Sequence, residues 1–384
     1  MEPRTASHPY SFQMTRWLLF LLTLTTTSTL FAQGTPFRQA KVGYDYQFPR
    51  DHGSHPDFKL EWWYLTGHLK STSTGRRFGF QATFFRTAIS EEASTSEFFD
   101  TTQGFLAHMA LLDIQTGKLH VEERLNRQGW DAQASTQDLD VRNGNWTLKR
   151  TPSEAHAETM TIQASIRSNA RMKLTLTPTK PKVIFGQNGI SRKSATSEAA
   201  SHYITFTRLR TTGTVSLLGE TFSVEGETWM DHEFSSSQLS EDQTGWDWAS
   251  IRLNDGRDIM LYRLRQRSGG IDPFSQLTWV DKESKQTRLK PKQWSWKARR
   301  QWTSPHTKAT YPIDIDVQAI DPASGNLRRL RLRPLIEDQE IVGKLDALSY
   351  WEGACDVLDE SDAVIGQAYV ELAGYDGRLT ERLR

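Results

Sequence analysis

Residues 60–69 read Leu-Glu-Trp-Trp-Tyr-Leu-Thr-Gly-His-Leu, a run of aromatic and aliphatic residues interrupted by single polar ones. This composition is typical of a β-strand. Similar short segments follow along the whole chain, separated by Gly, Asn and Ser, and no long amphipathic helix with caps is predicted. The segment 90–99 is the nearest helix candidate and fits a surface loop equally well. The predicted strands are 60–69, 78–85, 108–112, 146–148, 159–166, 173–177, 204–209 and 214–218, then 247–253, 258–265, 277–280, 293–296, 313–319, 327–332, 349–355 and 369–372.

The strand pattern predicts an all-β protein of antiparallel barrels or sandwiches. The chain has 384 residues, and single hydrophobic cores stop growing at about 250–300 residues. The polar stretch 235–245 is the natural junction between two halves. We therefore expect an N-terminal domain over 33–238 and a C-terminal domain over 239–384, packed together, each a barrel around an apolar cavity.

The first residues have the pattern of a secretory signal peptide, which we predict to be residues 1–32. Arg4 and Arg16 precede the apolar run 17–22, and a polar tail then leads to Ala32, the expected cleavage point. The apolar run is far shorter than the roughly 20 residues that span a bilayer. We expect export to the periplasm or beyond, and the single cysteine, Cys355, excludes an internal disulfide.

The balance of charges argues against nucleic acid as a partner. The net charge is +1, and removal of residues 1–32 lowers it to zero because two arginines and one glutamate are lost. The one basic cluster, 328–333, is short and interleaved with leucines, unlike the surfaces that bind phosphate backbones. A hydrophobic small-molecule ligand fits this composition better.

Two segments could carry chemistry, and the first is 61–64. Side chains alternate across a strand, so Glu61 and Trp63 share one face. Trp62 and Tyr64 share the opposite face. Glu61 has two interpretations. It could line a pocket with a raised pKa, or it could form an ion pair with an arginine such as Arg86 or Arg208.

The second segment is 226–234, Gly-Glu-Thr-Trp-Met-Asp-His-Glu-Phe. Alternation separates Asp231 from His232, so these neighbours cannot form a simple dyad. A partner for His232 must come from another strand, and Glu61 and Tyr203 are candidates. The alternative is a core histidine bound to a backbone carbonyl.

Two other groups of polar residues could contact a metal ion or a substrate. His52, His55 and Asp57 have a spacing that could hold a metal, yet they precede a strand in a turn, and we predict no metal there. Glutamates near the C-terminus, in 338–340, 350–353 and 369–375, lie among aromatic residues. They could contact substrate or could tie barrel ends together through Arg263 and Arg265.

Motifs for phosphate, dinucleotide, zinc-protease and serine-hydrolase sites are missing, so we expect no cofactor. Together, eight segments resemble the AttH/CrtC-type lipocalin-like family, described as predicted secreted hydrolases, whose relatives include carotenoid hydratases. They are Asp-His-Gly-Ser-His-Pro-Asp (51–57), Glu-Trp-Trp-Tyr-Leu-Thr-Gly-His-Leu (61–69), Gly-Ile-Ser-Arg-Lys (189–193), Ala-Ser-His-Tyr (200–203), Trp-Met-Asp-His-Glu-Phe (229–234), Gly-Trp-Asp-Trp (245–248), Tyr-Trp-Glu-Gly (350–353) and Tyr-Val-Glu-Leu-Ala-Gly-Tyr (369–375).

This resemblance implies two lipocalin-like, calycin-type β domains and, for the hydratases, addition of water to an isoprenoid double bond without a cofactor. Asp231 and His232 match the family's Asp-His pair. Phe234 stands where the family has a tryptophan, and the region around Met260 and Tyr262 lacks the family's Tyr-x-Asp.

We therefore expect a cofactor-independent hydratase or hydrolase acting on an isoprenoid or related lipid, with Asp231, His232 and Glu61 as catalytic residues. The alternative is a non-catalytic carrier or chaperone of a lipophilic ligand, associated with an envelope transport system. The expected substrate-binding residues are Trp62, Trp63, Tyr64, Tyr203, Trp229, Glu233, Phe234, Trp246 and Trp248.

Overall fold

Alternating hydrophobic segments form two antiparallel β-sheets in the computed structural model, which describes residues 37–88, 103–195, 199–343 and 349–377. The predicted signal segment 1–32 and the segment 90–99 lie outside the described residues. The all-β fold class is confirmed. One sheet is a nearly closed barrel and the other a half-barrel.

The described part of the first sheet has thirteen strands, and a 3-10 helix, η1 (Arg50–His52), precedes them. The strands are β1 (Leu60–Ser71), β2 (Arg77–Ala88), β3 (Gln103–Asp113), β4 (Lys118–Arg127), β5 (Ala132–Ala134), β6 (Asp140–Asn143), β7 (Trp146–Arg150), β8 (Met160–Ile166), β9 (Ala170–Pro178), β10 (Val183–Ile184), β11 (Ser191–Arg192), β12 (Ala200–Leu217) and β13 (Glu220–Ser237).

The second sheet has ten strands within the described ranges, and a 3-10 helix, η2 (Pro291–Gln293), lies between two of them. The strands are β14 (Gln243–Leu253), β15 (Asp258–Gln266), β16 (Gln276–Val280), β17 (Gln286–Leu289), β18 (Trp294–Thr303), β19 (Thr310–Ile320), β20 (Leu327–Pro334), β21 (Glu340–Ile341), β22 (Tyr350–Leu358) and β23 (Val364–Ala373).

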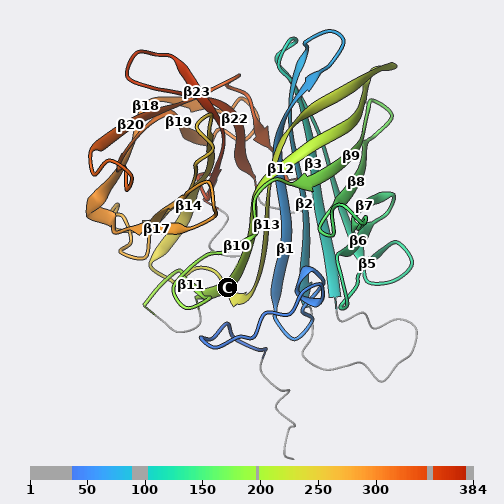
Figure 1. Ribbon diagram of the computed structural model, residues 1–384, viewed down its shortest axis with the longest axis horizontal. Helices are drawn as coiled ribbons and strands as arrows, with labels where there is room; N and C mark the ends of the chain where they lie inside the picture. Colours follow the sequence, from blue (N-terminus) through green and yellow to red (C-terminus); the bar gives the residue numbers. More distant parts are fainter. Residues whose placement is uncertain (1–36, 89–102, 196–198, 344–348, 378–384) are drawn as a thin grey trace, which may run out of the picture. The chain divides into compact units, whose positions relative to one another are not determined.

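Strand β1 lies inside the first sheet, hydrogen-bonded to β2 on one side and to β13 on the other (Figure 1). In the antiparallel register, Trp63 pairs with His232 and Tyr64 with Asp231. The two segments that the sequence singled out are therefore neighbouring strands. The change from the first sheet to the second falls between Ser237 and Gln243, within the stretch predicted as the junction. The domain boundaries themselves stay a prediction.

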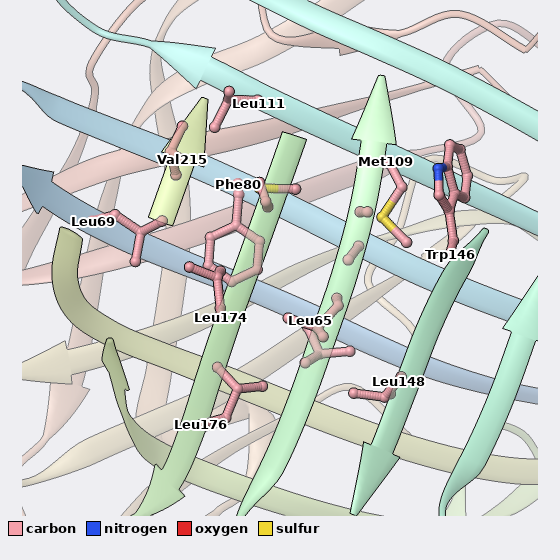
Figure 2. Packing of buried hydrophobic residues seen from close by; sticks show 14 of the residues in the cluster. Leu65, Leu69, Phe80, Met109, Leu111, Trp146, Leu148, Leu174, Leu176 and Val215 are labelled. Atoms are coloured by element: carbon pink, nitrogen blue, oxygen red, sulfur yellow. The ribbon is translucent and has the colours of Figure 1, made fainter. Parts of the chain in front are cut away.

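The interior of the first sheet is a packed hydrophobic core. One face of β1 contributes Trp63, Leu65 and Leu69 to a cluster of buried side chains drawn from most strands of that sheet. Figure 2 shows members of this cluster, including Phe80 and Met109, gathered between the strands. The sequence predicts an apolar cavity inside this barrel, and the structure shows large buried side chains packed there.

Another cluster of buried residues joins the two sheets, and it is rich in aromatic side chains with polar ends. Tyr64 of β1 donates a hydrogen bond to Glu352 of β22 over 2.6 Å. The indole N–H of Trp248 on β14 donates to the hydroxyl of Tyr203 on β12 over 3.1 Å. Within the described residues, no helix has the length and hydropathy needed to cross a bilayer.

Candidate functional site

A cavity of about 210 Å³ lies between the two sheets. Its wall contains many rings and several ionisable side chains. The aromatic residues are Trp62, Tyr64, Phe85, Tyr203, Trp246, Trp248, Tyr262 and Tyr350, and the ionisable ones other than tyrosine are Glu61, Arg86, His108, Lys193, Asp231, Glu233 and Glu371.

Strand alternation and register place the polar residues of β13 at this cavity. Asp231 is opposite Tyr64 of β1, and Glu233 is opposite both Trp62 of β1 and Tyr203 of β12. Because opposed residues on neighbouring strands point to the same face, these five side chains form one wall.

Asp231 is a buried carboxyl group surrounded by neutral donors. It accepts hydrogen bonds from the hydroxyl of Tyr203 over 2.6 Å, from Thr205 over 2.6 Å and from the indole of Trp229 over 2.8 Å. Burial raises its pKa to about 7, although those hydrogen bonds act to lower it. Asp231 can therefore hold and release a proton near neutral pH.

Glu233 lies two residues further along β13, and its side chain is on the same wall of the cavity. It accepts a hydrogen bond from Ser201, and the ammonium group of Lys193 lies 3.4 Å from its carboxylate. Burial raises the pKa of Glu233, and the Lys193 charge opposes that shift. The same ammonium group lies over the rings of Tyr203 and Tyr262, at 5.0 and 4.3 Å from their centroids.

The second sheet supplies a facing pair of carboxyl groups. Glu371 on β23 is opposite Glu352 on β22 in the register. Burial raises the pKa of Glu371 to about 8, while a hydrogen bond from Trp246 opposes the shift. The pKa of Glu352 is also raised, by burial and by the nearby Glu371. The pair of Glu352 and Glu371 can therefore also hold a proton at neutral pH.

The predicted pairing of these glutamates with Arg263 and Arg265 was wrong. Both arginines form ion pairs with Asp247 instead, at 2.9 Å for Arg263. Burial raises the pKa values of Glu352 and Glu371, and neither arginine offsets that shift by an ion pair.

The opposite face of β1 and β13 carries a network around Glu61, and two of its members, Glu61 and Arg86, also line the cavity. His232 contacts the Oε1 atom of Glu61 through Nε2 at 2.9 Å, and its ring stacks on Trp63 with centroids 4.8 Å apart. Glu61 is therefore the partner that alternation called for. Phe234 stacks on His55 with centroids 3.6 Å apart. The described residues that line the cavity do not include His232, Trp63 or Phe234.

Glu61 is an ion-paired carboxylate. Arg86 donates to its Oε2 atom over 2.9 Å, and the hydroxyl of Ser54 donates over 2.8 Å. Burial alone would raise the pKa of Glu61, but hydrogen bonds from His232 and His55 and the Arg86 charge hold it well below its usual range. The interpretation of Glu61 as a group with a raised pKa was therefore wrong. The alternative interpretation, an ion pair with Arg86, is confirmed. Arg208 pairs with Asp258 instead.

His55, Glu61 and His232 bring together residue types that could bind a metal ion. Their polar atoms bond to one another, with Nδ1 of His55 and Nε2 of His232 at 2.8 and 2.9 Å from Oε1 of Glu61. Two ligand atoms on tetrahedral zinc are about 3.3 Å apart. At these distances the three side chains form a hydrogen-bonded network.

The cavity includes six of the predicted substrate-binding residues, and Trp229 lies behind its wall as a donor to Asp231. Sequence reasoning named Lys193, Tyr350 and Glu371 only as members of motifs and Tyr262 only beside the missing Tyr-x-Asp, and it predicted none of the four as a substrate-binding residue. These residues lie on β15, β22, β23 and the loop after β11, so only the packing of the two sheets reveals them. The six are Trp62, Tyr64, Tyr203, Glu233, Trp246 and Trp248.

A family model described as AttH-like matches residues 39–375. A solved structure described as AttH from Nitrosomonas europaea is 32% identical, with 88% of this chain and 99% of that chain covered and a TM-score of 0.78. Kievitone hydratase from Nectria haematococca is 16% identical, with 89% and 96% covered and a TM-score of 0.65, a likeness of fold alone. The search of curated proteins gave no match.

Proposed function

Because the chain belongs to the AttH-like family, we propose that it is a cofactor-independent hydratase of a hydrophobic small molecule that binds between the two sheets. The observation that carries the proposal is the carboxyl group of Asp231, buried among aromatic rings with a pKa of about 7. A group that exchanges its proton near neutral pH is suited to general acid catalysis. The similar fold of kievitone hydratase agrees with this chemistry.

The proposed reaction adds water to a carbon–carbon double bond. The protonated carboxyl of Asp231 gives its proton to one carbon, forming a C–H bond and leaving a cation on the other carbon. The faces of Trp62, Trp246 and Trp248 stabilise that cation, an effect worth about 2 kcal/mol per ring when desolvated. Water then forms the C–O bond and gives one of its protons to the ionised Asp231, so the protonated acid is regenerated.

In this proposal His232 and Glu61 are positioning residues. They bond to each other across β1 and β13 at 2.9 Å, and their network fixes the two strands that present Asp231 and Tyr64 to the cavity. Substitution of His232 is therefore expected to change stability and substrate affinity, whereas substitution of Asp231 removes the acid itself.

The test is incubation of purified protein with a lipid extract of its host in water enriched in heavy oxygen, followed by mass spectrometry. Hydration adds one whole heavy water to a single product, whereas hydrolysis gives two fragments that share it. Asp231→Asn should abolish the product while Glu225→Gln, an exposed carboxylate on the same strand, should retain it. A product that survives in Asp231→Asn would contradict the assignment.

A carrier is the second candidate, and the observation that favours it is the cavity itself, which lies between the sheets and has eight Phe, Tyr and Trp residues in its lining. Such a protein would retain a lipophile unchanged and could serve an envelope transport system. Mass spectrometry of molecules retained by the natively purified protein distinguishes the two functions, because a carrier returns the ligand unaltered.

We also propose that the protein works outside the cytoplasm. The proposal rests on the two arginines and the apolar run that precede Ala32. N-terminal sequencing of the protein from its host should begin at Gln33, and an intact Met1 would contradict export by cleavage.

A further inference from the structure

The charges at the cavity are unevenly balanced. Arg86 is engaged by Glu61 at 2.9 Å, and Lys193 is engaged by Glu233 at 3.4 Å. Among the described residues, no lysine, arginine or histidine forms an ion pair with Asp231 or Glu371, which are held by neutral donors. The cavity therefore has two carboxyl groups, one on each sheet, that no cation in the described part of the chain pairs with.

Aromatic residues line the cavity together with these carboxyl groups. The rings of Trp62, Trp246 and Trp248 line the same space, together with tyrosines. Rings attract a cation through the negative potential of their faces, most strongly when water is excluded. Lys193 demonstrates the effect within this cavity, because its ammonium group lies over the rings of Tyr203 and Tyr262.

We propose that the cavity binds a lipophilic cation, namely a quaternary or protonated amine that carries an apolar chain, with its charge between Asp231 and Glu371. The inference rests on the proposed function and deepens it, since such a ligand resembles the cation that forms during hydration. An amine of this kind would bind as an analogue of that intermediate.

Binding of a permanent cation should also release protons from the protein. The carboxyl groups at or next to the cavity are Asp231 and Glu233 on β13, Glu352 on β22 and Glu371 on β23, with Glu61 on β1 already ionised. Lys193, Arg86, His108 and four tyrosines complete the titratable groups there. With pKa values of about 7 and 8 for Asp231 and Glu371, a cation favours their ionised forms, so its affinity should rise between pH 6 and 9.

The experiment is isothermal titration calorimetry of the purified protein with octyltrimethylammonium, 1-octanol and octanoate at pH 6 and pH 9. These probes share one chain and differ in charge, and the quaternary ammonium has no proton of its own. We expect octyltrimethylammonium to bind at least tenfold more tightly than octanol at pH 9, octanoate to bind most weakly, and the ammonium preference to shrink at pH 6.

Two variants on different sheets, Asp231→Asn and Glu371→Gln, should each reduce the preference for the ammonium probe at pH 9 by about tenfold, and Glu225→Gln should not. Circular dichroism checks that each variant is folded, and the ranking of the three probes on the wild type needs no variant. Equal or tighter binding of octanol overturns the cation inference and leaves the proposed ligand cavity standing. Failure of all three probes to bind counts against both. A preference that persists in both variants places the cation elsewhere and overturns the inference.

Discussion

Asp231 and His232 are neighbours in sequence, but their side chains lie on opposite faces of β13. Asp231 accepts a hydrogen bond from Tyr203 at the cavity, whereas His232 contacts Glu61 on the far side of the sheet. Strand β13 therefore turns Asp231, which can exchange a proton near neutral pH, and His232, which belongs to the charged network of Glu61, to opposite faces. Asp231 and His232 therefore belong to two different sites, and substitutions of the two residues should have different effects.

Replacing Asp231 with Asn should make stability less dependent on pH. The pKa of Asp231 is raised from 3.8 to about 7 by burial, so the folded state holds this proton more tightly than the unfolded state does. Ionisation of the buried group therefore costs the wild type stability as pH rises from about 4 to 7. Asn resembles the neutral carboxyl, so between pH 5 and pH 8 the variant should gain about 2–3 kcal/mol relative to wild type.

Urea denaturation at both pH values measures this difference. Glu225→Gln serves as the control because that carboxylate is exposed on the same strand. A constant gap between Asp231→Asn and wild type across the range would mean that Asp231 is already ionised at pH 5.

Glu61 and Arg86 form a buried ion pair whose members depend on each other. Their exposed fractions are each 1%. Removing one partner of such a pair costs about 3–5 kcal/mol, because the other charge is left buried. We expect Glu61→Gln and Arg86→Met each to lower the free energy of unfolding by that amount, and the double variant to lose less than the sum. Additive losses in this double-mutant cycle would show that the two charges are not coupled.

The strands and their alternating faces could be predicted because both depend on local backbone geometry. Residues 226–234 were assigned to two faces correctly, and Glu61 was named as a partner for His232. Strand β4 was missed because its residues, such as Glu122, Glu123 and Arg124, are charged and partly exposed, which gives no hydrophobic period.

The location of the cavity could not be predicted in the same way. Alternation tells which residues share a face, but it does not tell which face encloses a core and which one packs on a second sheet. Trp63 and Trp62 look equivalent in sequence, yet Trp63 is core and Trp62 lines the cavity. Lys193 and Glu371 reach the cavity only through contacts between distant segments.

Phe80 and Phe85, on the same strand, provide a direct test of that division. Phe80 is fully buried in the core of the first sheet, whereas Phe85 lines the cavity. Phe80→Ala should cost about 3–5 kcal/mol of unfolding free energy and leave affinity for octanol unchanged. Phe85→Ala should weaken octanol binding at a smaller cost in stability. Calorimetry measures the octanol affinity of both variants, and urea denaturation measures their stability. Weaker octanol binding in Phe80→Ala but not in Phe85→Ala would place the ligand inside the barrel.

Gly67, within the segment that identifies the first strand, leaves room for a neighbouring ring. A Cβ atom there would lie 2.3 Å from Cε1 of Phe80 and 2.8 Å from Oγ1 of Thr228. Overpacking of this kind costs about 1–3 kcal/mol, so Gly67→Ala should lower the thermal midpoint. Gly270→Ala is the control, because its Cβ would meet the flexible end of Gln266 at 3.0 Å and Oγ of Ser268 at an ordinary contact distance of 3.7 Å. Equal midpoints for the two variants would refute the close contact.

The hydroxyl of Tyr203 links the two sheets at the candidate acid. It donates to Asp231 over 2.6 Å and accepts from the Trp248 indole over 3.1 Å. Tyr203→Phe removes a donor that favours the ionised carboxylate, so the pKa of Asp231 should move above 7, and the unpaired indole should cost about 1–3 kcal/mol.

Infrared titration of the protonated carboxyl band, assigned by its loss in Asp231→Asn, measures the pKa of Asp231 in each variant. Trp248→Phe keeps the Tyr203 donor, so it should lower stability while shifting that pKa much less. If the two variants shift it equally, desolvation at the sheet interface controls the acid, and the Tyr203 hydrogen bond does not tune it. If only Tyr203→Phe shifts it, this hydroxyl sets the pH at which Asp231 gives up its proton.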